Sequence, residues 1–284
     1  MINKNKSFIF CATVLFLGGV FAYSKVEASS SPVGVIQGEA IMIHIETDFS
    51  AIKKITFGGV PVSIFKYRNW PTGIVGIDLN KAPGIYPVTA ELADGRTVST
   101  SVEVIKKKIK TAPYTIPEKL GGNTVEAQKN LVSSLAEENS NFKHLATANK
   151  ILWTSGFIAP LQSVTVNDEF GYHRQLGNMI MAHKGVDYKA SAGTKVGATN
   201  DGVVRVVGDY RNYGKTVVID HGLGVLSFYL HLSEAKVSVG QTVSRGEIIG
   251  LSGESGYADS PHLHFSIRIY GVSVDPVKFL ELFR

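Results

Sequence analysis

The stretch that decides the fold reads HLHFSIRIY, residues 262–270. Polar and apolar side chains alternate along it, which is the pattern of a β-strand with one buried face. Because side chains at positions i and i+2 of a strand share a face, His262 and His264 point the same way, while Leu263 packs into the opposite side. The sequence therefore predicts a strand that carries two imidazoles on one surface.

Two other segments place histidines on predicted strands. His231 lies in YLHLS, residues 229–233, between leucines that would face the core. His183 and Asp187 are the ends of HKGVD, and their even spacing puts both on one face if that segment is extended. We therefore expect one pocket to collect five side chains: His183, Asp187, His231, His262 and His264.

This set of side chains is typical of a catalytic zinc site. Two imidazoles and one carboxylate hold zinc with the fourth tetrahedral position left open, and the two other histidines can then transfer protons and stabilise an oxyanion. No His-Glu-x-x-His motif occurs, which argues against the helical zinc proteases. The only cysteine, Cys11, lies in the N-terminal apolar run, so the rest of the chain holds no thiolate site. The alternative is that these are ordinary strand histidines, since each short motif alone can arise by chance.

The remaining histidines are expected to have no direct role. His221 ends a predicted strand at a turn and should form a structural hydrogen bond. His173 follows a Phe-Gly-Tyr run and is expected in a loop near the site. His44 lies in an alternating strand without a partner ligand, and His144 lies off the apolar stripe of a predicted helix.

Length and composition limit the class of protein. The chain has 284 residues, enough for about two domains. With 44% hydrophobic residues, 19% charged residues and 29 glycines, it is too apolar to be disordered and too interrupted for a coiled coil or a multispan membrane protein. The net charge of +5 is too small to indicate a nucleic-acid partner.

The N-terminus has the features of an export signal. Lys4 and Lys6 precede an apolar run, Phe8–Tyr23, and Val26–Ala28 supplies small residues at the spacing that a signal peptidase reads. We predict a signal peptide at residues 1–28, cleaved after Ala28, and action in the periplasm, in the cell envelope or outside the cell. A retained membrane anchor is the alternative, but 16 helical residues extend about 24 Å, short of the roughly 30 Å hydrocarbon core.

The rest of the chain is predicted to be all-β, with two β domains joined by one amphipathic helix. Residues 33–105 predict an immunoglobulin-like β-sandwich, in which Asp94-Gly95 favours a hairpin turn. The expected strands of both domains are 40–46, 54–57, 60–65, 73–79, 84–92, 96–105, 202–207, 216–220, 225–232, 247–251 and 262–270.

Residues 106–152 predict a linker that contains a helix at about 124–149. The basic run 106–110 and two prolines mark its beginning. Asn123 with Glu126 resembles a helix-capping pair. The expected apolar stripe consists of Val125, Val132, Leu135, Phe142 and Leu145.

The second domain, residues 153–284, resembles the lysostaphin-type, or LytM-type, zinc metallopeptidases. The resemblance is carried, in order along the chain, by Trp153–Pro160, FGYHR (170–174), HKGVDY (183–188), GTKV (193–196), DGVV (201–204), VIDHG (218–222), YLHLS (229–233) and PHLHF (261–265). It implies an antiparallel β peptidase domain with one Zn²⁺ per chain, held by His183, Asp187 and His264. It also implies that His231 and His262 are the uncoordinated catalytic histidines.

The resemblance further implies a secreted endopeptidase that acts on peptidoglycan peptides. The Ser- and Gly-rich loop 252–261 is expected to form one wall of the substrate groove. The first domain would position the enzyme on the wall or inhibit it by covering the groove. The alternative with the same fold is a non-catalytic wall-binding or hydrolase-activating module; such relatives usually lack several of the five residues, and here all five are present.

Overall fold

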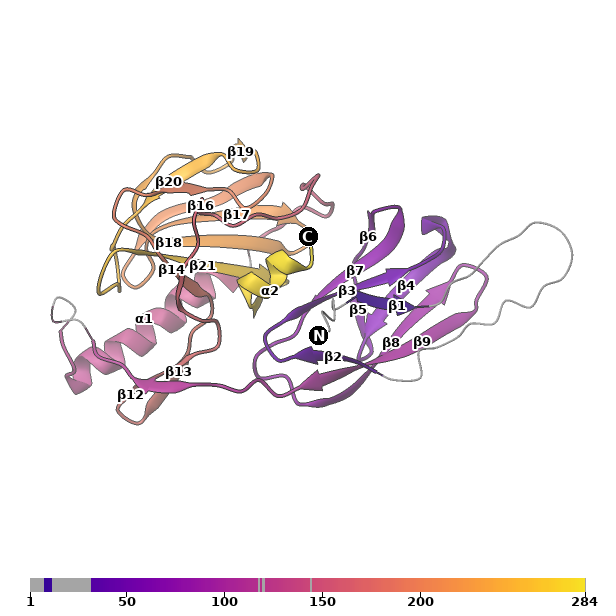
Figure 1. Ribbon diagram of the computed structural model, residues 1–284, viewed down its shortest axis with the longest axis horizontal. Coiled ribbons are helices and arrows are strands. Elements are labelled where there is room, and N and C mark those ends of the chain that lie inside the picture. Colours follow the sequence, from indigo (N-terminus) through magenta and orange to yellow (C-terminus); the bar gives the residue numbers. More distant parts are fainter. Residues whose placement is uncertain (1–7, 12–31, 117, 119–120, 144, 284) are drawn as a thin grey trace, which may run out of the picture. The chain divides into compact units, whose positions relative to one another are not determined.

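The fold comes from a computed structural model that describes residues 8–11, 32–116, 118, 121–143 and 145–283 (Figure 1). The predicted signal peptide lies outside the described residues except for Phe8–Cys11, and so does His144. The chain divides into two compact units, Met1–Lys107 and Lys108–Arg284. Within the described ranges, no helix is long and apolar enough to cross a membrane.

The first unit is built from two β-sheets with a shared core. Apolar side chains of both sheets, among them Ile41, Ile43, Val88 and Val102, are buried together. The hairpin predicted at Asp94-Gly95 joins β8 to β9, and Gly95 has the positive φ of 86° that this turn requires. The strand order in one sheet is β1 (Phe8–Cys11), β3 (Ala40–Ile45), β7 (Trp70–Gly76) and β6 (Ile64–Tyr67). The order in the other sheet is β2 (Val33–Ile36), β9 (Thr97–Ile105), β8 (Gly84–Leu92), β4 (Ile52–Phe57) and β5 (Val60–Val62). A short 3₁₀-helix covers Phe49–Ala51. This arrangement is compatible with a sandwich, and its immunoglobulin-like character stays a prediction.

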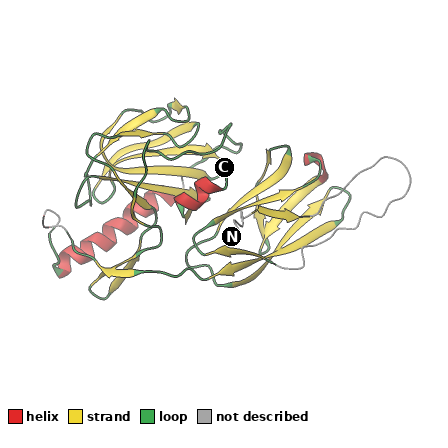
Figure 2. Ribbon diagram, in the orientation of Figure 1, coloured by secondary structure: helices red, strands yellow, loops and turns green. Residues whose placement is uncertain are grey.

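The second unit is a large, mostly antiparallel β structure (Figure 2). Its main sheet runs in the order β11 (Val166–Asp168), β14 (Val186–Lys189), β21 (His262–Ile269), β18 (Val225–Ala235), β17 (Gly214–Gly222), β16 (Gly202–Tyr210), β19 (Thr242–Val243), with β15 (Lys195–Gly197), β20 (Ile248–Ser252) and β22 (Val272–Val274) attached to it. A three-stranded sheet contains β10 (Thr111–Pro113), β12 (His173–Leu176) and β13 (Met179–Ala182). A short helix, α2 (Pro276–Glu281), begins at Asp275, whose side chain accepts two backbone hydrogen bonds as an N-cap.

Strand β21 occupies a central place in this sheet because it pairs with both β14 and β18. Its apolar face is fully buried: Leu263, Phe265 and Ile267 each have 0% exposure. Burial of three such side chains stabilises the sheet by roughly 5 to 9 kcal/mol. The opposite face, which begins with His262 and His264, is thereby fixed in direction by the core behind it.

The predicted helix is shorter than expected and belongs to the second unit. Helix α1 covers Val125–Lys143, and Thr124, not Asn123, caps it by accepting from the backbone N–H of Ala127 at 3.1 Å. The prediction of a helix to residue 149 is wrong because Ala148 bonds to the carboxylate of Asp220. The backbone beyond the helix therefore has partners on the β17–β18 turn. The expectation that one amphipathic helix joins the two domains stays unconfirmed, and a second, short helix, α2, lies near the end of the described chain.

The apolar stripe predicted for this helix is only partly correct. Val125 and Val132 are exposed, at 69% and 39%, whereas Phe142 is buried in a cluster with strands β17 and β18. The buried face consists of Ala127, Leu131, Glu138 and Phe142. Because a glutamate is part of the buried face, a search for apolar residues alone placed the buried face on the wrong side of the helix. The observed buried face packs on the second unit.

Candidate active site

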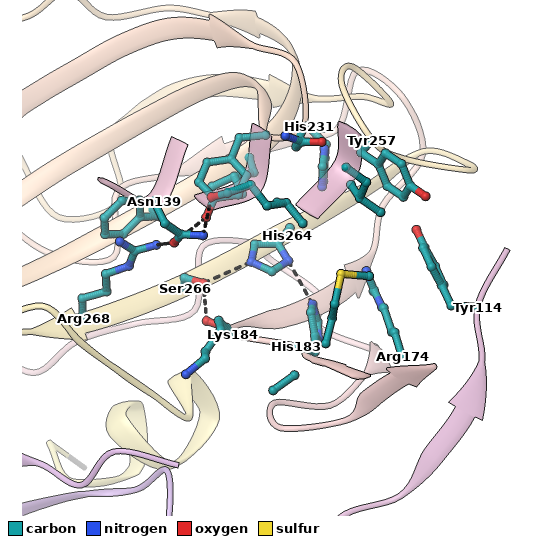
Figure 3. A pocket seen from close by; sticks show the side chains of 18 residues that line it. Tyr114, Asn139, Arg174, His183, Lys184, His231, Tyr257, His264, Ser266 and Arg268 are labelled. Carbon is teal, nitrogen blue, oxygen red and sulfur yellow. Dashed lines mark hydrogen bonds between the residues drawn. The ribbon is translucent and has the colours of Figure 1, made fainter. Parts of the chain in front are cut away.

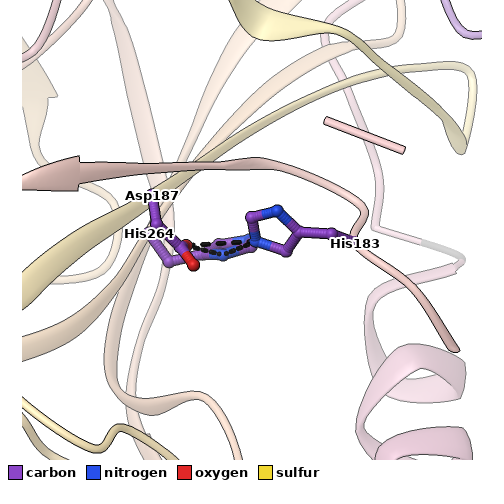
Figure 4. Close-up of side chains that lie close together, drawn as sticks. All are labelled: His183, Asp187 and His264. Carbon is purple, nitrogen blue, oxygen red and sulfur yellow. Dashed lines mark hydrogen bonds and ion pairs between the residues drawn. The ribbon is translucent and has the colours of Figure 1, made fainter. Parts of the chain in front are cut away.

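Three ligand-type atoms meet within the second unit. Asp187 on β14 and His264 on β21 are directly paired in register, and His183 lies just before β14. His183 Nε2 is 3.1 Å from Asp187 Oδ1 and 3.0 Å from His264 Nδ1 (Figure 4). The third side of this triangle, from His264 Nδ1 to Asp187 Oδ1, is 2.8 Å. We call these three side chains the metal cluster.

The other ring nitrogens of the two cluster histidines are held by the chain. His183 Nδ1 donates to the backbone carbonyl of Glu169 at 3.0 Å, so its Nε2 keeps a lone pair. His264 Nε2 donates to Ser266 Oγ at 3.1 Å, and that hydroxyl donates to the backbone carbonyl of Lys184 at 2.7 Å. Such outer hydrogen bonds fix the tautomer and the ring orientation of metal-binding histidines.

The carboxylate of the cluster is held by an arginine. Arg174 on β12 donates from Nη2 to Asp187 Oδ2 at 2.8 Å and to Asp168 Oδ2 at 3.0 Å. Its guanidinium also lies 5.0 Å from the ring centroid of Tyr114. Burial by itself would raise the pKa of Asp187, but His183 and His264 outweigh it and hold this pKa well below its usual value. Asp187 is therefore an anion at neutral pH, with Oδ1 directed at the two imidazoles.

These three residues fit a zinc ion. Neighbouring ligand atoms around tetrahedral zinc are about 3.3 Å apart, close to the separations in the metal cluster. Burial lowers the pKa of His264 to about 4, although the Asp187 carboxylate opposes this shift. The imidazole is thus neutral at pH 7, as a metal ligand must be. Two nitrogens and one oxygen also leave one tetrahedral position for a water or a substrate.

The two other predicted histidines lie beside the metal cluster. The ring centroids of His231 and His262 are 4.8 Å apart, and His231 is 6.0 Å from His264. His231 Nδ1 donates to the Ser255 carbonyl at 2.9 Å, and His262 Nδ1 donates to the Ser260 carbonyl at 2.8 Å. Each therefore keeps an unprotonated Nε2 that can accept a proton, in the same tautomer, and His262 Nε2 lies 3.8 Å from Asp187 Oδ1.

His231 is held in an unusual environment. Its backbone has a φ of 60°, which is uncommon for a residue other than glycine and typical of functional positions. Burial, with the nearby His262 and His264, lowers the pKa of its imidazole to about 3. His231 is therefore neutral at physiological pH and can accept a proton at Nε2.

The other described histidines are not members of the metal cluster. His221 is fully buried and hydrogen-bonded to the carbonyl of Asp201 and the hydroxyl of Ser227, both at 2.7 Å. His173 lies on β12 rather than in a loop. His44 belongs to the first unit, where it bonds to Thr72 at 2.8 Å.

A pocket opens next to the metal cluster, with a volume of about 160 Å³ (Figure 3). His183, His231 and His264 line one part of it, and Leu131 and Leu135 of helix α1 line another. Loop 252–261, which was predicted to form one wall of a substrate groove, contributes Tyr257 to the lining. The other lining residues are Tyr114, Asn139, Arg174, Met181, Ala182, Lys184, Asn212, Tyr213, Phe228, Leu230, Ser266 and Arg268. These three histidines thus face a mostly apolar space large enough for part of a peptide, whereas Asp187 and His262 are not among its lining residues.

Two residues that support the site were missed by the sequence analysis. Ser266 lies two positions after His264 and on the same strand face, so the alternation in HLHFSIRIY could have pointed to it. Arg174 lies in the FGYHR motif, but its distance of 13 residues from Asp187 carries no periodic signal. Its role depends on how β12 folds beside β14.

Comparisons with known proteins agree with this geometry. Residues 181–276, which contain all five site residues, match the model of peptidase family M23. Over 121 residues the chain is 40% identical to the DD-carboxypeptidase/endopeptidase Mpg of Neisseria meningitidis, which covers 42% of this chain and 28% of that protein. Over 99 residues it is 41% identical to the peptidoglycan DD-endopeptidase ShyA of Vibrio cholerae, covering 35% and 23%. The chain thus spans about a quarter of the length of these curated relatives.

A solved structure extends the likeness to most of the chain. A crystal structure assigned to peptidase M23 from Pseudomonas aeruginosa superposes with a TM-score of 0.63 at 26% identity, covering 89% of this chain and 97% of that one. One relative has another kind of name: the murein hydrolase activator EnvC of Escherichia coli is 42% identical over 97 residues, covering 34% of this chain and 23% of that protein. Residues 181–276 of this chain are a peptidase family M23 domain.

Proposed function

We propose that the second unit is a zinc endopeptidase that hydrolyses peptide cross-links or stem peptides of bacterial peptidoglycan. The observation that carries the proposal is the triangle of His183 Nε2, Asp187 Oδ1 and His264 Nδ1, with sides of 2.8 to 3.1 Å, beside two more imidazoles. The names of the relatives Mpg and ShyA support the substrate class, since both are DD-endopeptidases.

Zinc, when bound by the metal cluster, supplies a Lewis acid that polarises the scissile carbonyl and lowers the pKa of a coordinated water to about 7. The chain provides the proton transfers. His231 and His262 both direct an unprotonated Nε2 into the site, because their Nδ1 atoms donate to backbone carbonyls. One of them accepts at Nε2 the proton that the attacking water releases and passes it to the departing amine. The other would stabilise the developing oxyanion by a hydrogen bond when its own Nε2 carries a proton.

The place of action follows from the substrate. Peptidoglycan lies outside the cytoplasm, so the proposal requires export to the cell envelope, which agrees with the signal peptide predicted at residues 1–28. Mass spectrometry of the N-terminus of the protein recovered from envelope fractions tests this requirement. A mature chain that begins at Ser29 is expected.

The experiment that tests the proposal measures metal and product on the same protein. Purified full chain is expected to contain about one zinc and to release peptide fragments from walls of known cross-link chemistry, identified by mass spectrometry. His264→Ala should lose both zinc and activity. His231→Ala should keep zinc and lose at least about 100-fold in turnover, the value of a positioned acid–base group.

His173→Ala is the matched control because this histidine belongs to the same unit but lies outside the metal cluster. It should keep both zinc and turnover. A wild-type chain that binds no zinc at neutral pH contradicts the proposal. A chain that cleaves nothing but accelerates another wall hydrolase would instead be an activator, the function that the name of EnvC describes.

A further inference from the structure

Arg268 continues the polar face of the catalytic strand. It lies on β21 four residues after His264, with Ser266 between them on the same face, and all three line the pocket (Figure 3). At the rise of a strand, the Cα atoms of His264 and Arg268 are about 13 Å apart. This separation equals the length of about four extended residues of a bound peptide.

This arginine is buried without an anionic partner. Its exposure is 7%, yet Nε has no hydrogen-bond partner, and no carboxylate of the described residues lies within ion-pair distance. Nη2 donates to the neutral amide oxygen of Asn139 at 3.0 Å, and the guanidinium stacks 4.4 Å from the ring centroid of Phe228. Arg174 and Arg205 differ, since each pairs with a buried aspartate, at 2.8 and 2.7 Å.

A buried guanidinium without an anionic partner is costly. Its Nε is enclosed by the protein, so a ligand in the pocket would meet the Nη end of the side chain. The surroundings favour an anion. Among the described residues that line the pocket are three cationic side chains, Arg174, Lys184 and Arg268, and no aspartate or glutamate. Arg174 is already engaged by two carboxylates, so Arg268 is the arginine that lacks one.

We propose that Arg268 binds a free carboxylate of the peptide substrate and selects substrates that carry one within about four residues of the scissile bond. The inference rests on the function proposed above and adds its specificity. A guanidinium presents a planar fork of donors that matches a carboxylate bidentately, which neither an amide nor a lysine reproduces. In a wall peptide the carboxylate is that of a terminal D-alanine, of a diamino acid or of the D-glutamyl residue.

The test is a set of binding titrations on the zinc-loaded full chain. The probe is the tetrapeptide L-alanyl-γ-D-glutamyl-meso-diaminopimelyl-D-alanine, compared with versions in which one carboxylate at a time, or all of them, are carboxamides. Mass spectrometry confirms that each peptide stays intact during calorimetry. Wild type should bind the free peptide about 10- to 100-fold more tightly than the fully amidated one. The single amide that reproduces this loss identifies the carboxylate that is bound.

Arg268→Gln should remove the preference, and Arg268→Lys should restore only part of it. Arg245→Gln is the matched control, because this exposed arginine does not line the pocket. Equal binding of free and fully amidated peptide by wild type overturns the inference, and this comparison stands even if Arg268→Gln fails to fold. A preference that persists in a folded Arg268→Gln overturns it as well.

The two proposals fail separately. A chain that shows the carboxylate preference but releases nothing from purified walls refutes only the peptidase function. A chain that releases wall peptides but binds free and amidated peptides equally refutes only the role of Arg268.

Discussion

The stability of the second unit should fall on mild acidification because of one buried histidine. His221 has 0% exposure, and burial lowers the pKa of its imidazole to about 4, although the carbonyl of Asp201 opposes the shift. The unfolded chain binds a proton with a pKa of about 6.5. Between pH 6.5 and 4 the unfolded state therefore holds more protons, and stability decreases as the pH falls.

The size of this effect follows from the two pKa values. At 1.36 kcal/mol per pH unit, the contribution of His221 lowers the free energy of unfolding by roughly 1 kcal/mol at pH 5.5 and roughly 2 to 3 kcal/mol at pH 4.5, relative to pH 8. The loss levels off below about pH 3. His221→Gln removes the titration while keeping an amide that can donate and accept, so its stability should depend on pH by that much less.

The assay is urea unfolding of the full chain at pH 8, 5.5 and 4.5 in the presence of a zinc chelator, so that metal release does not contribute. A Trp70→Phe background leaves Trp153, which is buried in the second unit, as the reporting tryptophan. His173→Gln serves as the control for the loss of a histidine outside the buried network. If His221→Gln shows the same pH dependence as its parent, the assignment of a buried neutral imidazole is refuted.

Three further substitutions test the supports of the site. Glu138→Gln weakens the bonds that the helix carboxylate accepts from the backbone N–H groups of residues 212 and 213, at 2.9 and 3.2 Å, and should cost about 1 to 3 kcal/mol in urea unfolding; unchanged stability would contradict this role. Gly185→Ala should weaken zinc binding by at least about tenfold, measured by chelator competition, since a Cβ there would lie 2.4 Å from His264 Nε2. Ser266→Ala, which removes the acceptor for the same nitrogen, should weaken zinc binding about tenfold with Ser266→Thr restoring it; equal zinc affinity in all three proteins would show that this hydrogen bond does not orient the ring.

The strands of the second unit that carry the site were predictable because one of their faces is buried. The strand predicted at 262–270 is observed as β21, residues 262–269, and the prediction that Leu263 lies opposite His264 is confirmed by its 0% exposure. Alternation of this kind states directly which side chains share a face. The five predicted side chains do lie close together, although only His183, His231 and His264 line the pocket.

Other features had no local signal. The three-stranded sheet of β10, β12 and β13 consists of strands of three or four residues, too short for a period to be counted. Arg174 reaches Asp187 only because β12 folds beside the site. Glu138 can be buried only because the backbone N–H groups of residues 212 and 213 donate hydrogen bonds to its carboxylate. A buried polar group whose hydrogen-bond partner is distant in sequence leaves no mark in the pattern of apolar residues. Only the tertiary structure shows such a pair.

The polar face of β21 lowers the stability of the fold, and the site can lie on this strand because the opposite face compensates for that loss. His264 is kept neutral by burial, and Arg268 has no carboxylate partner among the residues that the structure describes, so neither is placed where it contributes most to folding. The opposite face, with Leu263 and Phe265 at 0% exposure, offsets that cost within the same strand. Because the core fixes the direction of every second side chain, the metal ligand, the proton carrier and the arginine lie on one face of the strand, and hydrogen bonds to Ser266, Ser260 and Asn139 orient their polar ends. A peptide that lies along β21 would then meet the metal cluster and Arg268 in a fixed order, which is why a preference for one carboxylate position is the expected form of specificity.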